Sequence, residues 1–324
     1  MNVFIGVAGL AASMFILPLV CFAGAQTEKA DNTEIPKAQT IVQEKLLEVD
    51  RQLAKKASQE GILHAFYPVL AKEAVLFPGN GHPVIGPVGC AAAIKQDEAD
   101  GMISKKEWEP LLAGISAQED LAYTHGRYSR GHADPELEDK LGYGYYATIW
   151  KKSKTGDWQI VVSLGLIDLD FMSFPPLDMK KKVTISKANA STAEVIKTEL
   201  DFAKLAREKG TNEAFYSYIA DTGLALSFNG PPSTKEFYRQ FMEQPHPEKK
   251  PDVKMPVLAW EPYYSFVSGS KDMAYNYGPY TFTVFDKEGN QFAAAGYFVT
   301  VWQRQSDNTW KFVLDGGNTC RHPD

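Results

Sequence analysis

Apolar positions along the chain follow a helical pattern and then an extended pattern, and this sequence of patterns occurs twice. In residues 44–58 and 194–208 the apolar side chains recur every three or four positions, which predicts amphipathic helices. Gly61 and Gly210 end the two stretches at matching places. From residues 108 and 260 onward the sequence alternates and is rich in β-branched and aromatic residues, which predicts strands. Helices grouped ahead of antiparallel strands predict an α+β fold in each half.

Between the first helix and the strands, both halves show the same smaller features. The segments 65–75 and 214–224 predict a second short helix. Loops rich in proline and glycine follow at 77–89 and 227–232, and each predicts a break before one more short helix.

The two halves are copies of one unit. Residues 53–67 match residues 202–216, and "DLAYTHGRY" (120–128) matches "DMAYNYGPY" (272–280). Residues 144–165 match 296–317 in the same register. Because the spacing between equivalent residues drifts so little, a complete unit of about 120 residues was duplicated. We expect domains at 38–167 and 191–318, joined by a linker at 168–190.

The first residues predict export. Residues 1–25 are uncharged and mostly apolar, and they end in Ala23-Gly24-Ala25. This pattern favours a signal peptide cleaved after Ala25, which makes the protein periplasmic or secreted and leaves no stable membrane span after processing. An uncleaved membrane anchor is the alternative, because the apolar run approaches spanning length.

Composition narrows the partners. The net charge of −6 argues against nucleic acid, whose recognition needs basic surfaces. The six histidines never fall at metal-ligand spacing, so we expect no metal site, and no sequence feature predicts a cofactor. Cys90 and Cys320 show no framework spacing, which leaves a disulfide between them open.

Several motifs recur in the same order in both copies: Gly-x-x-x-Ala-Phe, Trp-Glu-Pro, Asp-x-Ala-Tyr-x-x-Gly-x-Tyr, Gly-Tyr-x-x-Thr-x-Trp and a final Trp-x-x-Val. In this the chain resembles the SnoaL-like, domain-of-unknown-function branch of the nuclear transport factor 2-like superfamily. The resemblance implies two tandem cone-shaped, cystatin-like α+β domains. In each, N-terminal helices pack in a curved antiparallel sheet and leave an apolar pocket.

Members of this superfamily often pair through their sheets. We therefore expect the two domains to form a pseudo-two-fold dimer within the chain, and we keep a homo-oligomer open.

The repeated Trp-Glu-Pro begins at Trp108 and at Trp260. Along a strand the Trp and the Pro share one face and the Glu lies on the other. Because proline cannot donate to a sheet, we interpret the Pro as a bend and the Trp as core packing. A catalytic Glu109 or Glu261 is the alternative.

A second group of candidates lies on the following strand. Alternation places Tyr123, His125 and Arg127 on one face, and they could supply a proton donor, a base and an anion clamp. A solvated strand face is the alternative. The second copy has Tyr277 in place of His125, so the copies diverge and we expect at most one active site.

The isomerase branch of the superfamily uses a carboxylate base in an apolar pocket. The resemblance makes Asp221 and Asp315 candidates for this role, with a surface turn or a structural hydrogen bond as the alternative. Aromatic and basic side chains at equivalent positions are expected to pack in the cores or to line a ligand pocket. These are Phe66, Trp108, Arg127, Trp150, Phe215, Trp260, Tyr277 and Trp302.

The leading hypothesis is an exported module that binds a small apolar ligand or a protein partner. The alternative is an enzyme resembling isomerases or dehydratases that acts in one pocket, with Tyr123 and His125 as its first candidates. A purely structural role, with side chains filling both pockets, is the third interpretation.

Overall fold

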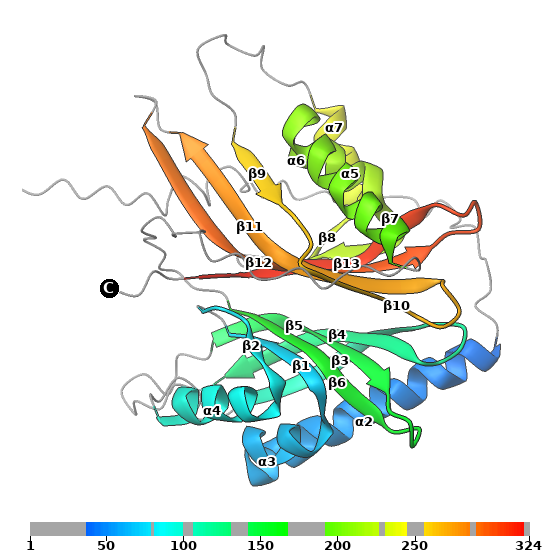
Figure 1. Ribbon diagram of the computed structural model, residues 1–324, viewed down its shortest axis with the longest axis vertical. Coiled ribbons are helices and arrows are strands. Elements are labelled where there is room, and N and C mark those ends of the chain that lie inside the picture. The colour runs from blue at the N-terminus through cyan, green and yellow to red at the C-terminus, as the bar shows by residue number, and fades with distance from the viewer. Residues whose placement is uncertain are drawn as a thin grey trace, which may run out of the picture.

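The two copies fold as two α+β domains that face each other through their sheets (Figure 1). The computed structural model describes residues 37–78, 81–99, 106–130, 142–167, 192–226, 231–244, 256–285 and 290–320. The expected signal peptide and linker lie outside these residues.

The first domain contains a six-stranded sheet in the order β2-β1-β6-β5-β4-β3. Its elements are α2 (Lys37–Glu60), α3 (Ile62–Phe66), the 3-10 turn η1 (Tyr67–Val69), β1 (Leu70–Phe77), β2 (Val84–Ile85), α4 (Gly86–Ala99), β3 (Lys106–Ile115), β4 (Leu121–Arg130), β5 (Gly142–Lys152) and β6 (Trp158–Ile167).

The second domain repeats this arrangement in a seven-stranded sheet, because the equivalent of β3 is divided into β9 and β10, which both pair with β11. Its elements are α5 (Ala193–Lys209), α6 (Thr211–Tyr218), β7 (Ile219–Ala225), β8 (Ser233–Thr234), α7 (Lys235–Glu243), β9 (Val257–Trp260), β10 (Tyr264–Val267), β11 (Met273–Phe285), β12 (Gln291–Arg304) and β13 (Trp310–Thr319).

The two tandem α+β domains expected from the sequence are confirmed, with one correction to the sheets. The second predicted helix of each copy is short and gives way to a strand, β1 or β7, which pairs in parallel with β6 or β13. The sheets are therefore mixed. A bulge between Leu70 and Val75 leaves buried residues in adjacent pairs along β1, and this spacing imitates a helical stripe.

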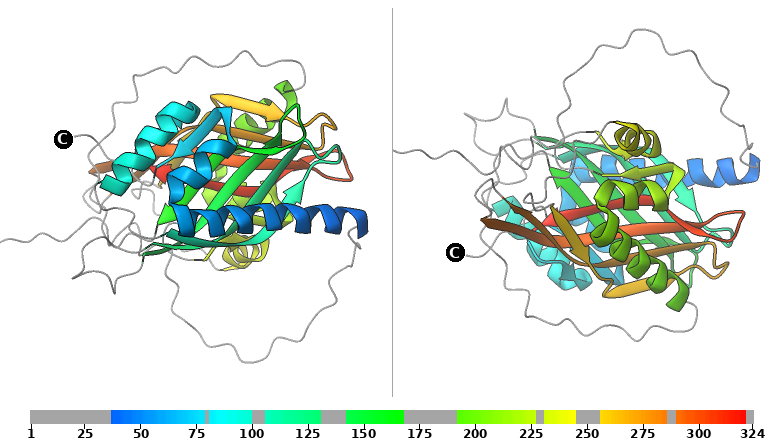
Figure 2. Two further views of the ribbon diagram at one scale, coloured as in Figure 1. Left: turned by 90° about the horizontal axis from the view of Figure 1, so that it is seen from below. Right: turned by 90° about the horizontal axis from the view of Figure 1, so that it is seen from above.

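Each domain packs its helices on one face of its sheet, which we call the inner face. Phe66 and Trp150 lie in the core of the first domain, and Phe215 and Trp302 lie in the equivalent core of the second. The opposite, outer faces of the two sheets pack against each other (Figures 1 and 2). The resulting order is helices, sheet, sheet, helices.

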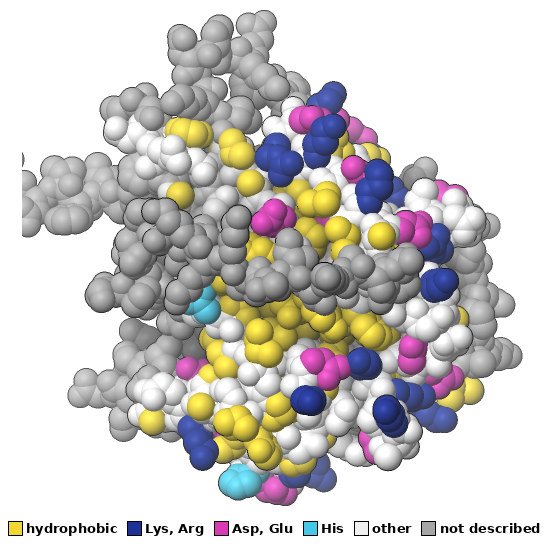
Figure 3. All heavy atoms as spheres, viewed as in Figure 1, with side chains coloured by type: hydrophobic (Ala, Val, Ile, Leu, Met, Phe, Trp, Pro, Cys, Tyr) yellow, Lys and Arg dark blue, Asp and Glu magenta, His cyan; other side chains and the backbone are white. Residues whose placement is uncertain are grey.

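The interface between the outer faces is a third hydrophobic core, to which both domains contribute. Its buried members include Val75, Phe77, Leu121, Tyr123, Ile149, Leu164 and Leu166 of the first domain and Met273, Tyr275, Val299, Val301, Val313 and Leu314 of the second. On the side seen in Figure 3, hydrophobic side chains gather in a band along the boundary between the domains. A sheet that would face water in an isolated domain is thus covered within the chain.

Two hairpin turns exchange equivalent hydrogen bonds across this interface. The backbone N–H of Gly269 donates to Asp120 Oδ2 at 2.7 Å, and the backbone N–H of Ala117 donates to Asp272 Oδ2 at 2.8 Å. Because Ala117 and Asp120 align with Gly269 and Asp272 in the repeat, the domains meet as the halves of a two-fold dimer do.

Three further findings bear on the sequence-based expectations. Cys90 and Cys320 are both buried free thiols. Within the described ranges no helix has the length and apolar character needed to cross a membrane. In the same residues His, Cys, Asp and Glu side chains do not gather in the groups of three that would hold a metal ion.

Candidate functional site

A buried carboxylate lies between helix and sheet in each domain. Asp50 of α2 is 1% exposed and Glu199 of α5 is fully buried. The two residues are equivalent in the repeat, and each points from the long helix toward the inner face. A buried carboxylate requires hydrogen-bond donors around it, and the two domains supply different donors.

The first domain satisfies Asp50 with side chains of the sheet. Trp108 Nε1 donates to Asp50 Oδ1 and the Tyr146 hydroxyl donates to Oδ2, both at 2.8 Å. Trp150 Nε1 donates to Thr124 Oγ1 at 2.9 Å, and Thr124 also hydrogen-bonds Asp50. Burial raises the pKa of the Asp50 carboxyl, and these hydrogen bonds oppose the shift.

The second domain uses a different donor set for Glu199. Trp260 Nε1 donates to Oε1 at 2.7 Å, whereas Trp302 Nε1 and Asn276 Nδ2 donate to Oε2 at 2.8 and 3.0 Å. Phe298 stands where the first domain has Tyr146, so no tyrosine hydroxyl takes part. Burial raises the pKa of the Glu199 carboxyl, and its N–H donors oppose the shift.

The two copies also differ in a row of polar side chains that crosses the inner face. Asn276, Thr300 and Asp315 are in register on β11, β12 and β13, and we call them the second polar row. The first polar row consists of Thr124, Thr148 and Ser163 at the equivalent positions of β4, β5 and β6. Directly opposed side chains in such a row lie about 5 Å apart.

Asp315 gives the second polar row an acid that the first row lacks. The Thr300 hydroxyl donates to Asp315 Oδ2 at 2.8 Å, and the Asp315 residue keeps some exposed surface. Burial raises the pKa of the Asp315 carboxyl to about 8, with a further contribution from the charge of Glu199. The carboxyl group is therefore mainly protonated at neutral pH and can donate as well as accept a hydrogen bond.

Asn276 leaves the second polar row incomplete. Its side chain is fully buried, and Oδ1 has no hydrogen-bond partner. Exchanging the amide oxygen and nitrogen would place the nitrogen in the same unpaired position, so either orientation leaves one polar atom unsatisfied. None of the first-row side chains has such an atom. Buried polar atoms without a partner are rare and often mark a bound molecule or water.

The sequence carries a signal for Asp50 and Glu199, although both residues lie outside the repeated motifs. Leu46, Asp50, Leu53 and Ala57 form one buried stripe of α2, and Val195, Glu199, Phe202 and Ala206 form the same stripe of α5. An acid in the apolar stripe of an amphipathic helix, at the same place in both copies, predicts a buried carboxylate.

The structure places the predicted row of β4 on the outer face. Tyr123 belongs to the core between the two sheets. His125 is buried on the same side, where its Nδ1 donates to the Tyr146 carbonyl at 2.8 Å, and burial lowers its pKa. Arg127 is exposed. These three side chains therefore face away from the inner face and from Asp50. Tyr277 also contacts this core, with its ring stacked on that of Tyr264.

Asp221 lies apart from the second polar row. Its side chain is 89% exposed and forms an ion pair with Lys235 at 2.6 Å.

The predicted aromatic positions lie mostly in the cores. Phe66 contacts Trp108 edge-on at 5.8 Å between ring centroids, and Phe202 of α5 similarly contacts Phe215, Trp260 and Trp302. Trp150 and Trp302 are fully enclosed.

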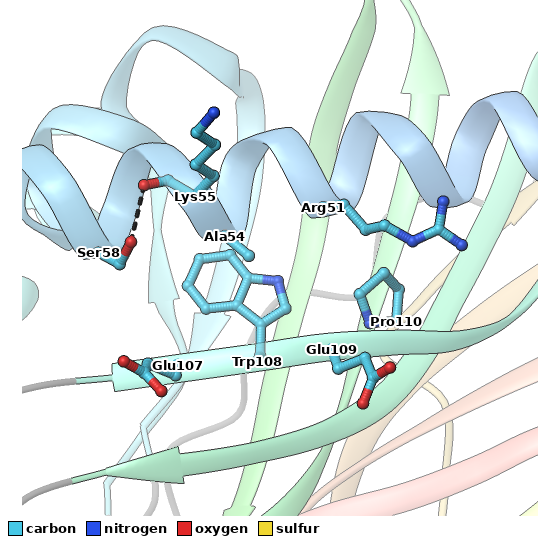
Figure 4. Close-up of a pocket in the computed structure, with 8 residues that line it drawn as sticks. All are labelled: Arg51, Ala54, Lys55, Ser58, Glu107, Trp108, Glu109 and Pro110. Carbon is cyan, nitrogen blue, oxygen red and sulfur yellow. Dashed lines mark hydrogen bonds between the residues drawn. The ribbon is translucent and has the colours of Figure 1, made fainter.

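Trp108 also lines a surface cleft of about 250 Å³ between α2 and β3 (Figure 4). In this cleft Lys55 points away from the indole ring, and Arg51 is already bonded to Glu44 and Glu48. Its polar groups do not converge, so we place the candidate site at the second polar row.

Comparison with known proteins bears on the fold. No family model and no curated protein matches the sequence. Similar solved structures include an NTF2-like protein of unknown function from Pseudomonas putida KT2440, with 16% identity, 46% of this chain and 97% of that chain covered, and a TM-score of 0.32.

A second similar structure is a protein of unknown function with a cystatin-like fold from Nostoc punctiforme PCC 73102. The sequence identity is 13%, the match covers 41% of this chain and 92% of that chain, and the TM-score is 0.30. A third similar structure is the association domain of CaMKII from C. elegans. The sequence identity is 12%, the match covers 40% of this chain and 96% of that chain, and the TM-score is 0.31. The two tandem α+β domains that the resemblance implies are present in the structure of the chain itself.

The raised pKa of Asp315 predicts a specific effect of pH on stability. Between about pH 4 and about pH 8 the folded chain holds a proton that the unfolded chain has released, so this group lowers stability as pH rises. Asp315→Asn removes the titration. We expect its free energy of unfolding, relative to the wild type, to rise with pH and to level off above about pH 8. Urea unfolding at several pH values measures this difference, and a difference independent of pH would contradict the assignment.

Proposed function

We propose that this chain is a small-molecule-binding module with two unequal halves. The second domain holds the ligand at the second polar row, and the first domain is its structural partner. The observation that carries the proposal is the contrast between two equivalent rows. None of the first-row side chains has a buried polar atom without a partner, whereas the second row contains the Asp315 carboxyl and the unpaired oxygen of Asn276.

The surroundings of the second polar row fit an apolar ligand with few polar anchors. Trp260, Phe298 and Trp302 belong to the same core, and Asn276, Thr300 and Asp315 are the polar side chains that cross it. Ligand pockets in proteins commonly combine an apolar lining with a small number of placed polar groups.

Native mass spectrometry of the purified full chain tests this proposal. We expect the wild type to retain a small molecule that is lost in Asp315→Ser, which installs the residue of the first copy. The matched control is Ser163→Ala at the equivalent position of the first domain, and it is expected to keep the ligand. Retention of the same molecule by Asp315→Ser, or its loss from Ser163→Ala alone, would refute the assignment to the second domain.

An enzyme acting in the same pocket is the second candidate. It is favoured by the pKa of Asp315, because an acid that titrates near neutral pH suits general acid–base catalysis. In this form the function would be an isomerisation or dehydration of a small hydrophobic substrate. Incubation of the recovered ligand with fresh protein, followed by mass spectrometry and chromatography, distinguishes conversion from binding.

We also propose that the protein is exported through a cleaved signal peptide. It is supported by the apolar segment 1–25 and its Ala23-Gly24-Ala25 ending. N-terminal sequencing of the protein from its natural host is expected to begin at Gln26, and a chain that retains residues 1–25 would contradict cleavage.

A further inference from the structure

The first sheet has an edge of which only a short part can accept another strand. β3 is the last strand of this sheet, and among the described residues it pairs only with β4. An edge strand presents backbone N–H and C=O groups that can pair with another extended segment. The register with β4 is regular from Lys106 to Pro110 and shifts before Leu112. Because a proline has no N–H and a bulge interrupts pairing, residues 106–109 are the part of the edge that remains suitable.

A surface cleft lies along the same residues. It has a volume of about 250 Å³, and it is lined by α2 on one side and by Glu107, Trp108, Glu109 and Pro110 of β3 on the other (Figure 4). Peptides that add a strand to a sheet edge gain affinity from backbone hydrogen bonds and specificity from pockets for alternate side chains. The cleft offers such a pocket, with the indole of Trp108 and the methyl group of Ala54 as its apolar surfaces.

Trp108 suits the role of an anchor, because its ring is fixed on one side and open on the other. Nε1 donates to Asp50 at 2.8 Å, and the rings of Phe66 and Tyr146 contact it edge-on at 5.8 and 6.4 Å between centroids. Trp108 nevertheless keeps exposed surface, whereas the equivalent Trp260 is buried. A side chain that is already ordered loses little entropy on binding, and tryptophans dominate the binding energy of many protein interfaces.

Two glutamates define the charge of the partner. Glu107 and Glu109 are exposed and flank Trp108 on the face of β3 that is turned away from α2, as Figure 4 shows. Side chains beside them on an added strand would lie on the same face, where opposite charges stabilise a pair and like charges destabilise it. The second copy has Ala259 in place of Glu107, so it lacks this pair of acids.

The nearby cations leave this negative charge available. Arg51 is already bonded to glutamates of its own helix, and Lys55 lies on α2, on the other side of Trp108 from the two acids. Arg127 of β4 is in register with Glu109, but it stands on the side of β3 opposite to the free edge. The net charge of −6 of the whole chain also favours the approach of a basic segment.

We propose that residues 106–109 and the adjacent cleft bind an extended peptide segment of a partner protein in which one apolar residue stands between two basic residues. The segment adds a strand to the edge at β3. Its apolar side chain enters the cleft against Trp108, and its basic side chains pair with Glu107 and Glu109. The site belongs to the first domain and is independent of the second polar row, so the inference goes beyond the proposed function.

Fluorescence anisotropy of short labelled peptides on the full chain tests the pattern. The first peptide has Lys-Leu-Lys at its centre, which reads the same in parallel and antiparallel pairing. The second has Lys-Lys-Leu, with the same composition but without the alternation, and the third has Glu-Leu-Glu. We expect the first to bind at least about fivefold more tightly than the second, and the third to bind most weakly. Equal binding of the two lysine peptides would mean that charge alone attracts them, and it would overturn the proposal.

Glu109→Lys and Glu261→Lys form a matched pair of variants. Both glutamates are exposed and follow the tryptophan of the repeated motif, and both substitutions change the net charge equally. We expect Glu109→Lys to weaken the Lys-Leu-Lys peptide about fivefold and Glu261→Lys to leave its affinity within about twofold. A peptide with Glu-Leu-Lys at its centre should recover the affinity on Glu109→Lys. Equal weakening by both variants, or no recovery, would refute a direct pair at Glu109.

Hydrogen exchange measured by mass spectrometry tests the added strand itself. We expect the Lys-Leu-Lys peptide to slow amide exchange in residues 106–109 and to leave residues 257–260 of the second copy unchanged. Binding without this protection would mean that the peptide contacts side chains only, and the added strand would be wrong.

Asp315→Ser separates this inference from the proposed function. We expect the variant to lose the retained small molecule and to bind the Lys-Leu-Lys peptide as the wild type does, because Asp315 lies in the other domain. Peptide binding that depends on Asp315 would contradict an independent site at β3. If the small molecule is retained by the wild type and no peptide binds, the inference fails and the proposed function stands.

Discussion

Glu199→Gln is expected to lower the free energy of unfolding by about 2–4 kcal/mol, because the amide nitrogen that it introduces must face an indole N–H. Trp260 Nε1 donates to one carboxylate oxygen and Trp302 Nε1 to the other. An indole nitrogen can only donate, so the glutamine NH₂ must meet an indole N–H in either orientation. The indole N–H that faces the NH₂ group therefore loses its acceptor inside the core.

Asp50→Asn is the matched control in the first domain. The asparagine oxygen can accept from Trp108, and its NH₂ group can then face the Tyr146 hydroxyl, which rotates to accept. We expect a loss of about 1 kcal/mol, since the hydrogen bonds with Trp108 and Tyr146 are retained without the charge. Urea unfolding of the two variants at one pH measures both effects. Equal losses would show that the chemistry of the donors does not determine the stability of these sites.

The duplication and the order of elements could be predicted from the sequence, because the matching segments share one register over the whole unit. Which strands pair with each other was harder to predict from the sequence. The residues of β1 have apolar spacing close to that of a helix, and only their pairing with β6 explains why they are extended. Local pattern is weak evidence where a bulge changes the alternation of a strand.

The candidate site could be predicted only in part, for two physical reasons. Alternation correctly groups Tyr123, His125 and Arg127, but it does not say which side of the sheet carries the helices. In β4 both sides are buried, since Ala122 contacts the helices and Tyr123 the second domain. Asp315 was a candidate from the sequence, whereas its pKa depends on the burial that α5 and the sheet create together.

The buried carboxylates explain why both copies have a tryptophan at this position, Trp108 in the first and Trp260 in the second. Each indole N–H is a donor to the buried acid of the long helix, so the tryptophan satisfies a polar group as well as filling the core. Glu109 and Glu261, in contrast, are exposed. The repeated Trp-Glu-Pro is therefore explained by its neighbours rather than by its own carboxylate.

Gly126→Ala and Gly278→Ala are each expected to lower the free energy of unfolding by about 3 kcal/mol or more, because the added methyl group meets backbone. A Cβ at Gly126 would lie 1.9 Å from the carbonyl oxygen of Glu109, and a Cβ at Gly278 would lie 2.0 Å from that of Glu261. Neither oxygen can move without shifting the backbone that carries it.

This close approach lies next to the proline of the repeated motif. The register of β3 shifts just after Pro110, and in the second domain the residues from Glu261 to Tyr263 interrupt the strand between β9 and β10. At this irregularity the carbonyl that precedes the proline lies against the neighbouring strand, where only glycine leaves room. The Trp-Glu-Pro motif and the glycine of Ala-Tyr-x-x-Gly-x-Tyr thus form one structural unit, which was copied together.

Gly81→Ala is the control for these two variants. Its added Cβ would have its nearest neighbour at 3.6 Å, an ordinary contact, so we expect a change within about 1 kcal/mol. Urea unfolding followed by tryptophan fluorescence compares the three proteins. Similar, large losses for Gly126→Ala and Gly278→Ala would show that the bend imposes the same constraint in both copies. A loss below about 1 kcal/mol in either would mean that its strand can move away, and that the bend is not fixed by the tryptophan anchored to the helix carboxylate.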